Sequence, residues 1–282
     1  MAPALPAVAV TGVTGAVGGL VARALAAEGR PLRLLARTPE RAPSLPGCVV
    51  VPSSYGDGEP SVAALRGVRT LFMVSAAEHQ DRLGQHRAFV AAAAEAGVQH
   101  VVYTSFAAAA EDAVFTLGRD HWATERAIVD AGLAHTFLRD SFYLDFLPET
   151  VGEDGVIRGP AGDGRVAAVA RADVARAAAA VLRDPEPHRG ATYELTGSEA
   201  LSFADVAAQV SAAQGGPVAY VDETLEEAYA SRTHYGAPRW EVDAWVSTYT
   251  AIATGQLARD TDDVQRLTGR PPLTLRQLLA EG

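Results

Sequence analysis

The chain of 282 residues contains no lysine and no asparagine, so all 24 of its basic residues are arginine. Without lysine, no side chain can form a Schiff base with a carbonyl substrate, and no P-loop lysine can bind a phosphate. Without asparagine, the chain has no acceptor for N-glycosylation. Schiff-base enzymes and P-loop nucleotide hydrolases are therefore excluded before any motif is considered.

Cysteine is also scarce, because Cys48 is the only one and no internal disulfide can form. It opens the apolar run Cys48–Val51, and we expect it to be a small buried hydrophobic residue rather than a reactive thiol. No run of eighteen apolar residues is present, and residues 1–6 lack the basic segment of a signal peptide. These absences predict a cytoplasmic protein that makes no membrane contact.

Basic charge is in deficit as well, since the formal net charge is −10 and the sequence pI is about 5.2. The arginines are scattered, so the long-range field works against binding nucleic acid. No group of histidine, cysteine and carboxylate residues has the spacing of a metal site, and we expect no metal. Hydrophobic residues make up 48% of the chain and charged residues 21%, which is typical of a globular fold.

Short apolar or β-branched runs alternate with segments of helical periodicity in the first two-thirds of the chain. The predicted strands are 7–11, 32–36, 48–51, 70–74, 101–104 and 134–138. Apolar residues at helical spacing over 17–25, and an alanine-rich stretch over 85–96, predict helices between them. This alternation is typical of the α/β class, with a Rossmann-like, doubly wound parallel sheet.

After residue 148 the alternation of strand and helix patterns gives way to a glycine-rich segment and then to mostly helical patterns. We therefore predict a second, smaller lobe. Residues 1–150 are expected to form a dinucleotide-binding Rossmann domain, to which 165–197 add a helix and a strand. Residues 198–282 are expected to form a mostly helical substrate lobe. Within these parts we predict turns over 152–164, helices over 171–182, 222–232 and 238–254, a strand over 192–195, and a capping box at Ser202–Asp205.

The strongest local signal is a glycine-rich loop over Thr11–Gly19, which follows the first predicted strand and opens the first predicted helix. Glycines there permit a tight turn and bring backbone N–H groups and the positive helix N-terminus close to a pyrophosphate. The cofactor contacts expected from this loop are Gly12, Thr14, Gly15, Ala16, Val17 and Gly18. The alternative is a tight strand-to-helix turn that binds no ligand.

The end of the second predicted strand indicates which dinucleotide is bound. NAD-specific sites carry a carboxylate there, whereas this chain has Ala36 followed by Arg37. A guanidinium matches a phosphate group with two parallel hydrogen bonds, so we expect NADP(H) as the cofactor. The alternative is that Arg37 and Arg41 are ordinary surface charges.

At this point the chain resembles the NmrA-like branch of the short-chain dehydrogenase superfamily, which includes bacterial NAD(P)H:quinone oxidoreductases and triphenylmethane reductases. The resemblance covers nearly the whole length and rests on the order and spacing of several motifs. They are Thr11–Gly15, Tyr55–Asp57, Gln85–Arg87, Tyr103–Ser105, His121–Glu125, Leu138–Arg139 with Tyr143, Ala161–Gly164, Arg171–Asp173 and Tyr193–Leu195.

The resemblance implies positions for the cofactor and the substrate. The implied cofactor contacts are Ser75, Ala76, Thr104, Ser105, His121 and Phe142. The implied substrate contacts are Phe106, Asp140, Tyr143 and Phe146. Relatives usually have asparagine at the position of Asp140, which here either accepts a hydrogen bond or cation from the substrate or caps a helix.

The resemblance also shows what is missing from the common catalytic pair of the superfamily. There a tyrosine protonates the substrate oxygen and a lysine four residues later lowers its pKa. Aligning the helix on Glu125 places the tyrosine position on Leu117 and the lysine position on His121. His121 is then a ribose contact, a proton donor or a structural residue. The candidate catalytic residues are therefore His121, Tyr143 and Asp140.

Loss of a proton relay favours acceptors that do not need a protein acid. Hydride addition to a quinone gives a delocalised phenolate, and addition to a cationic dye gives a neutral product, whereas a simple ketone gains roughly 10²–10⁴ in rate from a placed acid. We expect an NADPH-dependent reductase of a quinone-like or other conjugated aromatic acceptor. The alternatives are a non-catalytic redox sensor, and a tailoring reductase or isomerase of an aromatic secondary metabolite. A homodimer is compatible with the sequence.

Overall fold

The structure is a computed structural model that describes residues 5–281, and the chain divides into two compact units. The first unit comprises the chain up to Ser105 together with Asp120–Arg139 and Val174–Tyr193. The second comprises Phe106–Arg119, Asp140–Asp173 and the chain from Glu194 onward. The units interleave along the sequence, and the domain boundaries expected at residues 150 and 198 stay a prediction.

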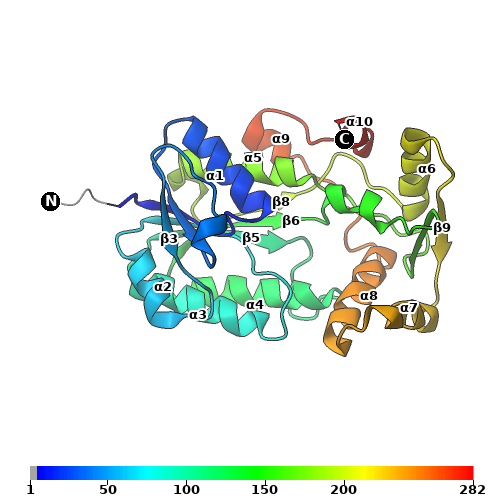
Figure 1. Ribbon diagram of the computed structural model, residues 1–282, viewed down its shortest axis with the longest axis horizontal. Helices are drawn as coiled ribbons and strands as arrows, with labels where there is room; N and C mark the ends of the chain where they lie inside the picture. The colour runs from blue at the N-terminus through cyan, green and yellow to red at the C-terminus, as the bar shows by residue number, and fades with distance from the viewer. Residues whose placement is uncertain (1–4, 282) are drawn as a thin grey trace. The chain divides into compact units, whose positions relative to one another are not determined.

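A seven-stranded sheet organises the first unit, in the order β3-β2-β1-β4-β5-β6-β8 (Figure 1). The strands are β1 (Val8–Val10), β2 (Arg33–Ala36), β3 (Val49–Pro52), β4 (Thr70–Met73), β5 (His100–Phe106), β6 (Ala134–Asp140) and β8 (Ala191–Leu195). Pairing is parallel, with Val10 opposite Leu34 on one side and Phe72 on the other. The Rossmann-like, doubly wound sheet predicted from the sequence is confirmed.

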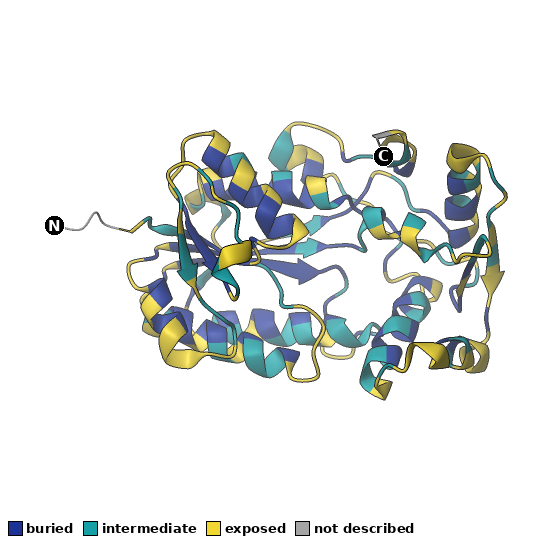
Figure 2. Cartoon of the chain, viewed as in Figure 1, coloured by how far each residue is buried: buried dark blue, intermediate teal, exposed yellow. Residues whose placement is uncertain are grey.

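Helices cover both faces of this sheet, which explains why β2, β4 and β5 are buried along their whole length (Figure 2). They are α1 (Ala16–Ala27), α2 (Gly58–Leu65), α3 (Arg82–Glu95), α4 (Thr116–Asp130) and α5 (Arg171–Arg183), with short 3-10 turns at Pro39–Arg41 and Glu186–His188. Figure 1 shows α1 and α5 on one face and α2, α3 and α4 on the other. Leu71, Phe89 and Ile128 are fully buried in the core between the sheet and helices α2, α3 and α4.

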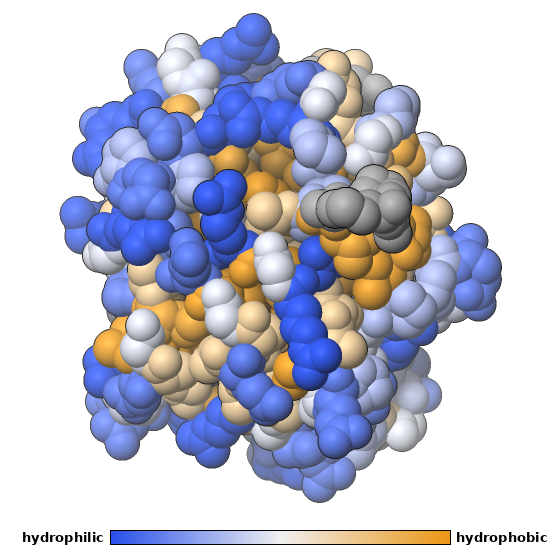
Figure 3. Space-filling view, turned by 90° about the vertical axis from the view of Figure 1, so that its left-hand side faces the viewer, coloured by the Kyte–Doolittle hydropathy of each residue, from blue (hydrophilic) through white to orange (hydrophobic). Residues whose placement is uncertain are grey.

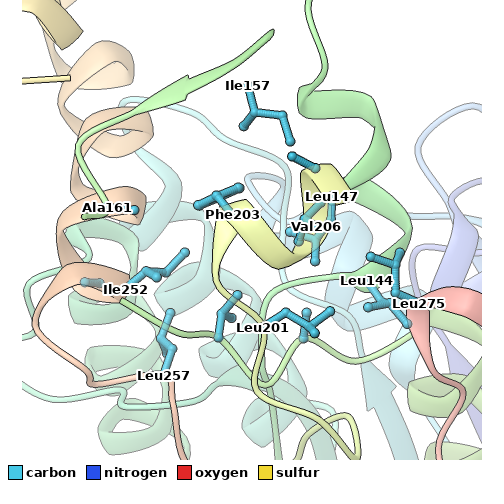
Figure 4. Close-up of a cluster of buried hydrophobic side chains, with 14 of the residues drawn as sticks. Leu144, Leu147, Ile157, Ala161, Leu201, Phe203, Val206, Ile252, Leu257 and Leu275 are labelled. Atoms are coloured by element: carbon cyan, nitrogen blue, oxygen red, sulfur yellow. The ribbon is translucent and has the colours of Figure 1, made fainter. Parts of the chain in front are cut away.

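The second unit is built around a two-stranded parallel sheet of β7 (Val156–Gly159) and β9 (Ala219–Asp222). Its helices are α6 (Phe203–Gln214), α7 (Leu225–Ser231), α8 (Arg239–Ala253), α9 (Asp263–Thr268) and α10 (Leu275–Glu281), with 3-10 turns at Leu144–Phe146, Pro148–Thr150 and Thr233–Tyr235. Figure 4 shows its core, in which Leu147, Ile157 and Phe203 are buried together. The predicted capping box is confirmed, because the side chains of Ser202 and Asp205 each bind the other residue's backbone N–H.

Three expectations about local structure are wrong. Cys48 is partly exposed because the strand that follows it lies at the edge of the sheet. The helix expected from residue 222 begins at Leu225, since Asp222 ends β9 and Thr224 caps the helix with Glu227. The glycine-rich stretch 152–164 is not only turns, because it contains β7.

On the face shown in Figure 3, hydrophilic residues surround patches of hydrophobic residues. Within residues 5–281, no helix is long and apolar enough to cross a membrane. The prediction that the chain lacks a signal peptide falls partly on residues 1–4, which lie outside the described residues.

Two histidines of the first unit are enclosed in its interior. His86, on α3, has none of its surface exposed, and His100, at the start of β5, has 1% exposed. Burial, reinforced by the Arg82 charge, lowers the pKa of His86 to about 3. Burial, reinforced by Arg189, lowers the pKa of His100 to about 4. Both side chains are therefore neutral in the folded protein at physiological pH.

These histidines predict that the protein loses stability in mild acid. In the unfolded chain each histidine has a pKa near 6.5. Below that pH the unfolded state therefore binds protons on these histidines, whereas the folded state does not. At pH 5 each site should reduce the free energy of unfolding by about 2 kcal/mol, before the carboxylates begin to titrate. Thermal melts at pH 7 and pH 5 test this, and His100→Leu should narrow the difference between them. Equal midpoints for the wild-type protein at the two pH values would contradict it.

Candidate active site

The glycine-rich loop between β1 and α1 is shaped by two close backbone approaches. Gly12 has φ +64°, and a Cβ there would lie 2.9 Å from Cβ of Val74. A Cβ on Gly18 would lie 2.4 Å from the carbonyl oxygen of Gly12. Glycine is needed at 12 because of its positive φ and the nearby Val74 side chain, and at 18 because a Cβ would overlap the Gly12 backbone. The loop therefore brings the start of α1 tightly against the end of β1.

The N-terminus of α1 is left open for an anion. Its N-cap residue, Gly15, has no side chain to accept from the first-turn amides, and no acidic residue stands in the first turn. Thr14, Gly15 and Ala16 are exposed, whereas Val17 and Gly18 are buried. Unpaired N–H groups and the helix dipole favour a phosphate at such a position. The structure thus brings the predicted contacts together in the loop and the first turn of α1, namely Gly12, Thr14, Gly15, Ala16, Val17 and Gly18.

Arg37 directly follows β2 and is exposed to solvent. Among the described residues its guanidinium has no hydrogen-bond or ion-pair partner, as is also the case for Arg41, which follows it in the chain. The group is free to bind an anion at the carboxyl edge of the sheet. The same edge carries the glycine loop, because parallel strands end together there.

Ser105, expected near the cofactor, is committed to a buried ion pair. Its hydroxyl donates to Glu125 Oε1 at 2.5 Å, and Arg139 binds both oxygens of that carboxylate at 2.8 and 2.7 Å. Thr104 instead faces the preceding strand end, where its Oγ1 accepts from the N–H of Ser75 at 2.8 Å. The two neighbouring residues of β5 therefore have different roles. Ser105 binds a carboxylate in the core, and Thr104 lies beside the expected cofactor path.

His121 is 6% exposed and is engaged on both ring nitrogens. Arg82 donates to Nε2 at 3.0 Å, and Nδ1 lies 3.1 Å from the hydroxyl of Tyr103. A guanidinium can only donate, so Nε2 carries no proton and the imidazole is neutral. Burial, followed by the Arg82 charge, holds the pKa of His121 well below its usual value. This geometry suits a fixed, neutral imidazole and not a proton donor.

In the second unit, Asp140 and Tyr143 form a buried pair. The phenol of Tyr143 donates to Asp140 Oδ2 at 2.6 Å, and Asp140 is 4% exposed. The guanidinium of Arg171 lies 4.9 Å from the centre of the tyrosine ring. Burial and then the Asp140 charge hold the pKa of Tyr143 well above its usual value. The phenol is therefore neutral, with its proton committed to the carboxylate.

Aromatic rings gather beside this pair. Phe106 and Phe142 meet edge to face with centroids 6.1 Å apart, and Phe142 lies 6.4 Å from Phe146. Phe115 joins them, 4.8 Å from Phe106. The structure thus brings together, within the second unit, the residues expected to contact the substrate, and it places Phe142, expected at the cofactor, among them.

Sequence reasoning missed several members of these networks, namely Arg82, His86, Tyr103, Phe115 and Arg171. His86, Tyr103 and Arg171 lie within motifs that carry the family resemblance, but no role was assigned to them. Arg82 and Phe115 lie outside those motifs, and their sequence pattern also fits ordinary packing or a surface charge. Within residues 5–281 no group of side chains is arranged to hold a metal ion.

A doubly wound sheet with a glycine loop, an open helix N-terminus and a free arginine after β2 defines a Rossmann-type dinucleotide-binding protein. More particularly, the chain belongs to the NmrA-like family, whose model matches residues 6–237. The resemblance inferred from the motifs is therefore confirmed.

Three curated relatives match almost the full length of the chain. Quinone oxidoreductase 2 of Escherichia coli is 33% identical over 278 residues, which cover 96% of each chain. The NAD(P)H azoreductase of Xenophilus azovorans is 34% identical over 273 residues, covering 95% of each. A (4-alkanoyl-5-oxo-2,5-dihydrofuran-3-yl)methyl phosphate reductase of Streptomyces griseus is 36% identical over 280 residues, covering 96% of each.

Solved structures show the same fold. The crystal structure of an NADPH-dependent quinone oxidoreductase from Escherichia coli, complexed with NADPH, superposes with a TM-score of 0.89 at 31% identity. It covers 97% of this chain and 99% of its own. The likeness extends over both units of the chain, each of which has its counterpart in that enzyme.

Proposed function

We propose that this protein is an NADPH-dependent oxidoreductase that transfers hydride to a quinone-like or other conjugated aromatic acceptor. The observation that carries the proposal is the open N-terminus of α1 beside a free Arg37, which together fit a pyrophosphate and a 2′-phosphate. When bound, the reduced nicotinamide supplies the hydride. The residues of this chain bind, orient and shield the reactants.

The loop residues 12–18 would hold the pyrophosphate through backbone N–H groups, since the close approaches at Gly12 and Gly18 leave room for nothing larger than hydrogen. Arg37 would bind the 2′-phosphate, and its lack of a partner among the described residues leaves its donors available. Ser75, Ala76 and Thr104 would line the path of the cofactor. His121 would act as a fixed, neutral positioning group.

The acceptor is proposed to contact Tyr143, Asp140 and the phenylalanines of the second unit. Flat rings such as Phe106, Phe142 and Phe146 suit an aromatic acceptor. No acid in this set is poised to protonate an alkoxide, because the Tyr143 proton is held by Asp140 and His121 is neutral. The arrangement favours acceptors whose reduced form is stabilised by delocalisation.

The named activities of the relatives support this acceptor class. A quinone, an azo compound and an oxo-dihydrofuran each join the reducible bond to a conjugated electron-withdrawing group. Hydride addition to any of them yields a delocalised anion. The particular acceptor of this chain, and whether it forms a homodimer, stay predictions.

An acceptor panel tests the proposed function. The protein is incubated with NADPH and, in turn, a benzoquinone, a naphthoquinone, an azo dye, a triphenylmethane dye and a simple aliphatic ketone, while the nicotinamide absorbance is followed. We expect oxidation with one or more conjugated acceptors and none with the ketone. Tight NADPH binding without oxidation by any acceptor would overturn the reductase and favour a redox sensor.

Replacing Arg37 tests the cofactor preference. Arg37→Ala should raise KM for NADPH about tenfold or more and leave KM for NADH within twofold, because only the 2′-phosphate loses its partner. The control is Arg23→Ala, which removes another exposed arginine of the same unit. It should change KM neither for NADPH nor for NADH. Equal KM values for NADPH in Arg37→Ala and the wild-type protein would show that the 2′-phosphate binds elsewhere.

Replacing Tyr143 tests the acceptor contacts. Tyr143→Phe should lower kcat/KM for the acceptor about tenfold, since the substrate loses a phenol and Asp140 loses its donor, while the dissociation constant of NADPH stays within twofold. The matched control is Tyr229→Phe, because Tyr229 donates to Asp243 at 2.8 Å in the same unit. If both variants keep wild-type turnover, Tyr143 is no part of the site.

A further inference from the structure

A short segment at the carboxyl end of β4 is held in an unusual way. Beyond Met73 the strand has ended, yet Val74, Ser75 and Ala76 are only partly exposed, so their N–H and C=O groups need partners. In the part of the chain that the structure describes, no backbone group of a strand or helix binds the amides of Val74, Ser75 and Ala76. Five side chains from other parts of the first unit bind these backbone groups instead.

Two of the five come from the strand ends beside β4. Thr11 Oγ1 accepts from the N–H of Val74 at 2.9 Å, and Thr104 Oγ1 accepts from that of Ser75 at 2.8 Å. A third, Tyr55, donates its hydroxyl to the carbonyl oxygen of Val74 at 2.5 Å. These contacts hold the first half of the segment against β1 and β5, at the point where the order of the sheet reverses.

The other two come from one face of α3, four residues apart. His86 Nε2 accepts from the N–H of Ala76 at 2.9 Å, and Arg82 Nε donates to its carbonyl oxygen at 2.9 Å. Both side chains are almost fully buried, at 0% and 3% exposure. The peptide groups on either side of Ala76 are therefore oriented entirely by this pair.

The protonation of His86 follows from its neighbours. Because Nε2 accepts from a backbone amide, the proton must be on Nδ1, which lies 2.8 Å from Thr124 Oγ1. The Thr124 hydroxyl in turn donates to the carbonyl oxygen of Asp120 at 2.7 Å. Arg82 is similarly tied to α4, through His121 at 3.0 Å and Asp120 at 3.5 Å. The two side chains that bind Ala76, Arg82 and His86, are thus held by contacts with both α3 and α4.

One part of the segment is left unengaged. Within residues 5–281, no group hydrogen-bonds to the hydroxyl or to the carbonyl oxygen of Ser75, which is partly exposed. In open α/β sheets, ligands bind beyond the carboxyl ends of the strands at the point where the order reverses. An acceptor and a hydroxyl in a fixed place there suit the ribose hydroxyls of a dinucleotide.

We propose that Arg82 and His86 are positioning residues of the dinucleotide site, which hold Ala76 and thereby set Ser75 for the cofactor without contacting it themselves. The inference rests on the proposed function, because it takes NADPH as the ligand. It assigns a role in cofactor binding to two buried residues that would otherwise be considered only part of the core. Preorganisation of this kind lowers the entropic cost of binding.

The test compares two histidine replacements in the same unit. His86→Leu removes the acceptor for Ala76, and we expect the dissociation constant of NADPH, measured by fluorescence titration, to rise about tenfold. His100→Leu is the matched control, since His100 is equally buried but lies at the amino end of β5, where it pairs with Thr136. It should lower the melting temperature comparably and leave the dissociation constant within twofold.

Two further variants cover the case in which His86→Leu does not fold. His86→Gln keeps an acceptor and a donor and should recover most of the affinity. Arg82→Met should weaken NADPH binding about tenfold and raise KM for NADPH. The Ala76 amide should also exchange its hydrogen faster in both the Leu and Met variants without cofactor present.

The outcomes separate this inference from the proposed function. Wild-type protein that binds no NADPH overturns both. NADPH binding by the wild type, with unchanged dissociation constants in folded His86→Leu and Arg82→Met, overturns the positioning role alone. An equal loss of affinity in His100→Leu would also overturn it, because general destabilisation would then explain the effect.

Discussion

The close approach of the Thr11–Gly12 backbone to α1 on one side and to Val74 on the other is the constraint on which the first unit depends. A Cβ at Gly12 or Gly18 would overlap its neighbours, so the contact exists only with glycine at both places. It brings an open helix N-terminus to the carboxyl edge of the sheet. It also lets the Thr11 hydroxyl reach across to the segment that follows β4.

Buried polar networks extend outward from that contact and replace the regular hydrogen bonding that ends with the strands. In the first unit, neutral histidines, an arginine and hydroxyl groups bind loop backbone and each other. Every buried donor or acceptor that lacks a partner costs free energy, so these networks have few alternative arrangements. Acid disturbs both buried histidines, because protonated His86 could no longer accept from the Ala76 amide and burial disfavours a charge on His100.

The second unit uses charge differently. The phenol of Tyr143 donates to Asp140 Oδ2, and the guanidinium of Arg171 lies over the tyrosine ring. A carboxylate can only accept, and it fixes the phenol as a donor pointing inward.

The sequence by itself determined the alternation of strands and helices, the glycine loop and the position of Arg37, because these follow from local periodicity, turn chemistry and composition. It also placed Ser75, Asp140, Tyr143 and His121 among the candidates, through a family resemblance. Only the tertiary structure decided the partners of those side chains. His121 meets Arg82 from 39 positions away and Ser105 meets Glu125 from 20, and nothing local specifies such pairs. The partly exposed Cys48 and the short strand β9 were decided in the same way, by which neighbour the fold placed beside them.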